Sequence, residues 1–141
     1  MSSVALIVVA VVALWGPGAP ETAAAAAATI NQEGTCVRVG PAQQADYTVE
    51  VSVTYVQGPR WGYWGQGGSF SMALDHIRAT AVTKRAGAVA GIVEIQSPVA
   101  SIAVGTGSFW LSGPVPAQYG EIGRDLGRKL LALLEKECQT G

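Results

Sequence analysis

The side chains able to do chemistry in this chain are few. Its two cysteines are Cys36 and Cys138, and an even pair in an oxidising compartment is typical of a disulfide. Two separate free thiols are the open alternative, because the sequence does not give the Cα separation that a bridge requires. The single histidine, His76, completes no zinc site with the cysteines, since no two of these residues have ligand spacing. We therefore expect no bound metal.

One acid–base pair stands out, because Asp75 directly precedes His76. On a strand, adjacent side chains point to opposite faces, so this carboxylate is badly placed to orient the imidazole as a general base. The glycine-rich stretches at 65–68 and 105–107 complete neither a dinucleotide-binding nor a Walker pattern, and no serine lies in a nucleophile-elbow sequence. We predict that the protein is not an enzyme and needs no cofactor.

A short segment of aromatic residues and glycines has the most unusual composition. It contains Arg60, Trp61, Tyr63 and Trp64. Because Trp, Tyr and Arg carry most of the energy of interface hot spots, these four are the candidate partner-binding residues. Contact with a membrane interface and cover for a small core are the two alternatives. The glycines and prolines around them predict a long loop, Gln57–Ser69. A pocket under this loop is the basis of a second hypothesis, a small secreted enzyme or ligand-binding domain.

The chain has 141 residues and so holds one domain. Near its start lie an unbroken apolar run, Val4–Trp15, and six consecutive alanines, Ala23–Ala28. An apolar run of this length is short for a membrane-spanning helix and fits the apolar region of a secretory signal peptide. We predict a signal peptide over residues 1–28. An uncleaved anchor and a buried core helix are the alternatives.

The remaining residues predict one folded domain over residues 45–141, preceded by a linker or first short strand over residues 29–44. Between Asp46 and Val56 apolar and polar residues alternate with a period of two, which indicates a half-buried strand. Further along the chain, 102–104 and 109–111 are candidates for short strands.

A hairpin and a helix complete the expected fold. Two strands, Ile77–Lys84 and from Val89 to about residue 96, flank a turn at Gly87. Apolar residues then recur in steps of three and four over Tyr119–Glu137, which predicts an amphipathic helix with Cys138 on its buried side. We expect an α+β fold: a two-layer sandwich in which a small, mainly antiparallel sheet packs on the C-terminal helix.

Charge narrows the classes of partner. Nine Lys and Arg residues face ten Asp and Glu residues, so no basic surplus is available for phosphate contacts. The same balance argues against a polybasic membrane-binding segment. We expect no nucleic-acid partner, and membrane contact only through the N-terminal leader if that leader stays uncleaved.

The stretch Ala45–Ser52 resembles a strand of the curli-secretion-channel family of outer-membrane lipoproteins, whose pattern is Ala-Asp-x-x-Val-Glu-Gly-Ser. In that family a glycine-rich loop follows, and then a segment that begins Leu-Asp-x-Ile, as Leu74–Ile77 does here. Ala86-Gly87 stands at the family's next turn, and Glu121–Cys138 at its closing helix. The resemblance covers about residues 45–137, extends to small envelope lipoprotein domains, and lacks the lipidation cysteine.

This resemblance implies a periplasmic or secreted protein of the bacterial envelope that acts in the secretion or assembly of surface structures. Together with the missing catalytic set, it predicts an exported, non-enzymatic domain. Its partners would be envelope proteins, further copies of the same chain among them. The aromatic segment and a sheet edge are the expected contact surfaces.

Overall fold

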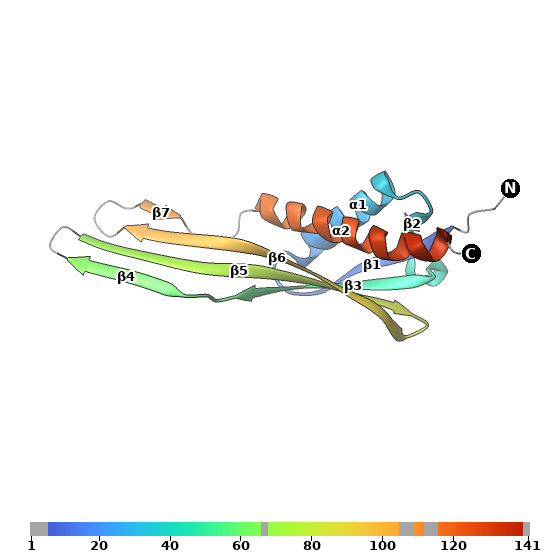
Figure 1. Cartoon of the computed structure of the whole chain (residues 1–141), viewed down its shortest axis with the longest axis horizontal. Coiled ribbons are helices and arrows are strands. Elements are labelled where there is room, and N and C mark those ends of the chain that lie inside the picture. Colours follow the sequence, from blue (N-terminus) through green and yellow to red (C-terminus); the bar gives the residue numbers. More distant parts are fainter. Residues whose placement is uncertain (1–5, 66–67, 105–108, 112–115, 140–141) are drawn as a thin grey trace.

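The computed structural model describes residues 6–65, 68–104, 109–111 and 116–139. Its strands are β1 (Ile7–Trp15), β2 (Val37–Val39), β3 (Tyr47–Val56), β4 (Arg60–Gly65), β5 (Gly68–Arg85), β6 (Ala88–Val104) and β7 (Phe109–Leu111). Its helices are α1 (Ala19–Glu33) and α2 (Pro116–Gln139), with a 3-10 turn, η1 (Ala42–Gln44). One sheet has the strand order β2-β1-β3-β5-β6-β7, and β4 pairs with β5. Both helices lie on one face of this sheet (Figure 1).

The prediction of a two-layer α+β fold is therefore confirmed. The sheet is mainly antiparallel, as expected, although β1 pairs in parallel with both β2 and β3. A parallel pair needs a crossover connection, and α1 supplies it between β1 and β2.

The N-terminal segment is where the structure differs most from the predicted domain boundaries at residues 28 and 45. Ile7–Trp15 of the apolar run forms β1, which lies between β2 and β3, with Val9 fully buried. Val9 and Ala10 point to opposite faces and are both buried, and a strand buried on both faces is typically a continuous apolar run. Towards the end of the strand, Val12, Leu14 and Trp15 are 41–55% exposed. Ile7–Trp15 is thus part of the sheet, and cleavage near Ala28 would remove a strand that lies between two others. An export signal itself stays a prediction.

The six alanines Ala23–Ala28 form the middle of α1, which lies beside α2 (Figure 1). Pro20 in the first turn and the alanines after it favour a helix. Two glycines of α2, Gly123 and Gly127, allow close approach: an added Cβ would lie 2.5 Å from the Thr22 carbonyl oxygen and 2.9 Å from that of Ala26. The small side chains of this segment therefore serve helix–helix packing.

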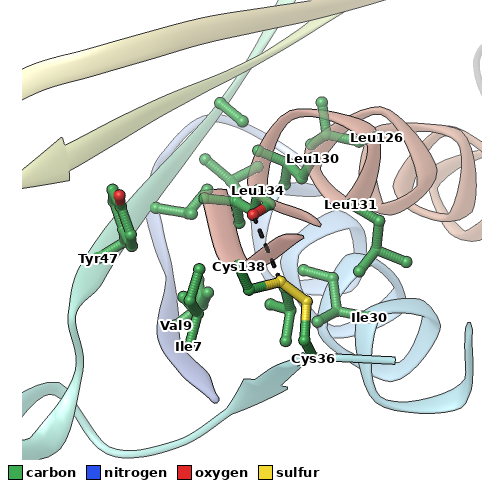
Figure 2. Packing of buried hydrophobic residues seen from close by; sticks show 14 of the residues in the cluster. Ile7, Val9, Ile30, Cys36, Tyr47, Leu126, Leu130, Leu131, Leu134 and Cys138 are labelled. Atoms are coloured by element: carbon green, nitrogen blue, oxygen red, sulfur yellow. Dashed lines mark hydrogen bonds between the residues drawn. A yellow bond between two sulfur atoms is a disulfide. The ribbon is translucent and has the colours of Figure 1, made fainter. Parts of the chain in front are cut away.

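The main core lies between the helices and the sheet (Figure 2). Its fully buried members include Ile30, Val49, Leu126 and Leu130. A disulfide joins Cys36, just before β2, to Cys138 in the last turn of α2, and both cysteines are buried in this core (Figure 2). Their Cα atoms are 6.3 Å apart, within the range that a bridge needs. The pair that the sequence offered as a candidate is thus bonded.

The predicted hairpin is present, but its strands are longer than expected. β5 has 18 residues and β6 has 17, and positive φ angles at Ala86 (52°) and Gly87 (83°) form the turn. The strand after Asp46 and the C-terminal helix are confirmed as β3 and α2. The predicted loop Gln57–Ser69 is wrong, because β4 and the start of β5 occupy most of it. Alternating aromatic residues favour a strand here in spite of the glycines.

Two regions of the molecule can be distinguished in Figure 1. The body consists of the two helices, β1 to β3, and the portions of β5 and β6 near their turn. The arm is the part of the sheet that extends beyond the helices: β4, Gly68–Leu74 of β5, Val99–Val104 of β6, and β7. In the described part of the chain, no helix is both long enough and apolar enough to cross a membrane.

Candidate interaction surface on the arm

The arm continues the sheet of the body through two shared strands. The β5 strand pairs with β3 up to Val56 opposite His76, and then with β4 from Arg60 opposite Ala73. On its other side it pairs with β6 from Phe70 to Arg85. The arm is therefore held to the body by backbone hydrogen bonds of two continuous strands.

One face of the arm carries exposed apolar side chains. Trp61 lies directly opposite Met72, and Tyr63 opposite Phe70, so these four side chains share a face. This is the open face, the face turned away from the helices, because the buried Ala79 and Ala81 take the alternate positions of β5. Trp61 is 48% exposed, Tyr63 67% and Phe70 39%. Aromatic side chains that are this exposed do not cover a hydrophobic core, which was one of the alternatives for this segment.

Arg60, the first residue of β4, is the one charged residue in the sequence of the arm. The sequence holds no Asp, Glu, Lys or Arg between Arg60 and Asp75, nor between Glu94 and Glu121. These two stretches include nearly the whole arm, whereas the body carries almost all the charged residues of the chain. An exposed apolar surface without charge is typical of the buried centre of a contact with another molecule.

The sheet edge at β2 is closed by side chains. The backbone N–H of Val39 donates to Oδ1 of Asn31 over 3.0 Å. The guanidinium of Arg38 donates to the carbonyl oxygens of Gly34 and Val37 over 2.7 and 3.0 Å. Backbone groups that already have hydrogen-bond partners cannot pair with a strand of another chain. This edge is therefore an unsuitable docking site.

The β6 edge of the body is closed in a similar way by α2. Lys129 donates to the carbonyl oxygen of Glu94 over 3.5 Å, and Gln118 to that of Pro98 over 2.9 Å. Pro98 has no N–H to offer, and a bulge in the pairing with β5 interrupts the edge near Ala90. Helix side chains, a proline and a bulge are three devices that protect an edge strand.

The edge of β4 has a different character. Among the described strands, β4 pairs with β5 alone. The backbone N–H of Leu74 donates to the Pro59 carbonyl oxygen, so odd-numbered residues of β4 face β5 and even-numbered ones such as Gly62 direct their backbone groups outward. The arm thus presents a strand edge with outward backbone groups beside its aromatic face.

At the start of the arm, a buried carboxylate connects three elements. Asp75 is 5% exposed and accepts a hydrogen bond from the Gly58 N–H over 2.8 Å and another from the Tyr55 hydroxyl. It faces the helix side of the sheet, whereas its neighbour His76 lies on the open face opposite Pro98. The structure therefore separates the two members of the acid–base pair.

The remaining predicted residues have simple positions. Of the four candidate partner-binding residues, Trp61 and Tyr63 are brought together on the arm's open face, while Arg60 and Trp64 have side chains outside the described part. The two pockets that the structure describes lie in the body: one next to Cys138 and one between β6 and α2. Neither lies under the segment Gln57–Ser69, where a pocket was the alternative hypothesis.

The sequence reasoning missed part of this surface. The second strand is expected only from Ile77, so Phe70 and Met72 belong to no expected element, and the sequence pattern does not connect Asp75 to the aromatic segment. A signal was present: Phe70, Met72 and Leu74 recur with a period of two and no charged residue between them.

Comparison with known proteins gives likeness in fold. No family model and no curated protein matches this chain. A minor lipoprotein of Acinetobacter baumannii is 8% identical, with 92% of this chain and 93% of that chain covered and a TM-score of 0.49. A protein of Caulobacter crescentus is 13% identical, with 95% and 92% covered and a TM-score of 0.45. A PelC dodecamer from Paraburkholderia phytofirmans is 19% identical, with 89% of both chains covered and a TM-score of 0.40.

These likenesses concern the course of the backbone at low sequence identity. They do not show the curli-secretion-channel family that the sequence resembles, and this resemblance stays a prediction. The function must therefore be argued from the chain's own surfaces.

Proposed function

We propose that this chain is an exported, non-enzymatic domain of the bacterial cell envelope that makes protein–protein contacts through its arm. The observation that carries this proposal is the arm's uncharged open face, on which Trp61 and Tyr63 are about half and two-thirds exposed. Large aromatic side chains gain most when a partner removes them from water, which is why they dominate interface energies.

The partner is a protein of the envelope, and a second copy of this chain is one such partner. An open strand edge next to an apolar face suits an extended segment, because the backbone of the segment pairs with the edge while its alternate side chains pack on the face. In this way the arm would act in the secretion or assembly of surface structures.

Two features of the body support the exported and non-enzymatic parts of the proposal. The buried disulfide between Cys36 and Cys138 fits an oxidising compartment such as the periplasm. The carboxylate of Asp75 and the imidazole of His76 lie on opposite faces of the sheet, an arrangement that does not support general acid–base chemistry between them.

The test compares a double variant of the open face with a control variant and the unmodified chain. Trp61→Ser with Tyr63→Ser removes two aromatic side chains and leaves the backbone edge; Thr54→Ser, on the open face of the body's β3, is the control. A photo-crosslinker at Phe70 in cells should give crosslinked protein species with the unmodified chain and the control, and lose at least about tenfold of them in the double variant. Sedimentation velocity separates self-association from binding to another protein. Equal crosslinking in all three chains would refute the proposal.

The edge has its own test at Gly62. Pro at this position removes an outward N–H without touching the hydrogen bonds to β5, whereas Gly62→Ala keeps the N–H. We expect crosslinking to fall with Gly62→Pro and to persist with Gly62→Ala. The same fall in both variants would show that the edge does not pair with the partner.

A further inference from the structure

The arm begins with a one-residue change of register. Opposite β5, the pairing passes from Val56 opposite His76 to Arg60 opposite Ala73. Three residues, Gln57–Pro59, therefore lie against two, Leu74 and Asp75. Because side chains alternate between faces along a strand, one extra residue moves all following side chains to the other face.

This extra residue decides what the arm presents. In β3, the even-numbered residues share the open face with His76. In β4, the odd-numbered residues Trp61 and Tyr63 share it with Met72 and Phe70. Without the register change, even-numbered positions such as Gly62 would lie on the open face, and both aromatic residues would lie on the other.

The carboxylate of Asp75 lies opposite the extra residue and holds it. Its Oδ1 accepts the Gly58 N–H over 2.8 Å, and its Oδ2 accepts the hydroxyl of Tyr55 from the last part of β3. Gly58 lies so close to the Leu74 carbonyl oxygen that any Cβ would overlap that oxygen. The Leu74 N–H then donates to the Pro59 carbonyl oxygen over 3.0 Å, which starts the new register.

We propose that Asp75 is the positioning residue that fixes the register of β4 on β5 and thereby places Trp61 and Tyr63 on the open face. A buried carboxylate with a backbone N–H and a hydroxyl as donors makes charge-assisted hydrogen bonds, which are stronger than those between neutral groups. The competing register, in which Gly62 lies opposite Phe70, lacks the bulge that these bonds hold. The consequence for partner binding rests on the proposed function; the register itself does not.

Paired cysteines measure the two registers directly. Gly62→Cys with Ser71→Cys reports the observed register, since these residues lie directly opposite each other. Gly62→Cys with Phe70→Cys reports the competing register. Both new cysteines of each pair fall in one tryptic peptide, Trp61–Arg78. After mild oxidation, crosslinked cysteines are not alkylated, so the unalkylated fraction of this peptide is the crosslinked fraction. In the Asp75→Ala background, we expect the ratio of the 62–70 to the 62–71 crosslink to rise about tenfold.

Two variants separate positioning from general loss of structure. Asp75→Asn keeps an oxygen acceptor for the Gly58 N–H and should restore most of the 62–71 crosslink. Asp46→Ala is the control. It also removes a carboxylate that accepts a backbone N–H, that of Val8 over 2.9 Å, but this carboxylate lies in the body. The ratio of the two crosslinks should therefore stay unchanged. An unchanged ratio in Asp75→Ala would overturn the proposal.

Should Asp75→Ala fail to fold, Tyr55→Phe removes the hydroxyl donor and keeps the Gly58 N–H as a donor to Asp75. The ratio must then shift in the same direction, and no shift in that folded variant overturns the proposal as well. Partner crosslinking, measured on the same variants, distinguishes the two proposals. A changed register with unchanged partner binding would support the role of Asp75 and count against the arm as the contact surface.

Discussion

The body and the arm share two strands, yet the same strands meet different surroundings in each. In the body, β5 buries Ala79 and Ala81 completely beneath the helices, and helix side chains close the outer edge of the sheet. In the arm, β5 leaves Phe70 and Leu74 about 40% exposed, and β4 has an edge without such cover. The difference indicates a division of labour: the body supplies stability, and the arm supplies a surface.

The comparison also teaches how one strand can serve both purposes. The energy of folding comes mainly from apolar area removed from water, which the body provides between two helices and the sheet. The arm adds backbone pairing but little burial of its described side chains. Changes in the two regions should therefore have separable effects, and the following experiments test this separation from the largest expected effect on stability to the smallest.

The largest effect is expected in the core of the body. Leu130 is fully buried between α2 and the sheet, so Leu130→Ala should lower the free energy of unfolding by about 2–5 kcal/mol. Leu133 on the same helix is 36% exposed, and Leu133→Ala is the matched control with a clearly smaller loss. Urea unfolding followed by circular dichroism measures both. Equal losses would contradict the packing of α2 described above.

The disulfide should have the next largest effect. It closes a loop of 102 residues, and replacing Cys36 and Cys138 together with Ala should cost about 2–4 kcal/mol of stability, mainly because the unfolded chain regains freedom. The melting temperature of the double variant should stay the same with and without reductant, while that of the unmodified protein, reduced in denaturant and refolded, should fall. A double variant with the same melting temperature as the oxidised protein would contradict the conclusion that the body supplies the stability.

A smaller effect depends on pH. Burial, and then the nearby carboxylate of Glu21, raise the pKa of Tyr119 above its ordinary value of 10.0. With the folded pKa above the unfolded one, the stabilising contribution is present below pH 10 and is lost as the pH rises through the folded value. Stability should therefore fall above about pH 10, and Tyr119→Phe should flatten that part of the profile. An unaltered alkaline profile in Tyr119→Phe would show that another group is responsible.

The smallest effect on stability is expected in the arm. Tyr63 is 67% exposed, so Tyr63→Ser should change the free energy of unfolding by no more than about 0.5 kcal/mol, although it removes part of the proposed contact surface. Thermal unfolding monitored by circular dichroism checks this value. A loss comparable to that of Leu130→Ala would mean that arm and body fold as one inseparable core.

The sequence predicted those parts of the fold that depend on local patterns. Alternation after Asp46 predicted β3, Gly87 predicted the hairpin turn, and the spacing of leucines predicted α2. These features need only nearby residues to be interpreted correctly. The pairing of Cys36 with Cys138 was foreseen as a candidate because the helix pattern put Cys138 on the buried side.

Prediction failed where distant partners decide the structure. The sequence of Val4–Trp15 is compatible with a signal peptide, a buried helix or a central strand, and pairing with β2 and β3 makes its residues Ile7–Trp15 a strand. The glycines in Gln57–Ser69 predict a loop when the segment is considered alone. Residues 60–65 form the strand β4 because they pair with Gly68–Ala73 of β5, and this pairing cannot be read from the segment itself. Asp75 was assessed as an acid next to His76, whereas its actual partners are Tyr55 and Gly58.

The position of the disulfide has a consequence for the order of events during synthesis. Cys36 emerges early, directly after the β1–α1 unit, but its partner lies 102 residues later, in the last turn of the last helix. The correct bridge can form only once α2 has been made and has docked beside α1. Two-electron oxidation of both thiols by an oxidant of the compartment, such as another protein's disulfide, therefore reports that the chain has been completed. A chain truncated before α2 keeps Cys36 as a free thiol.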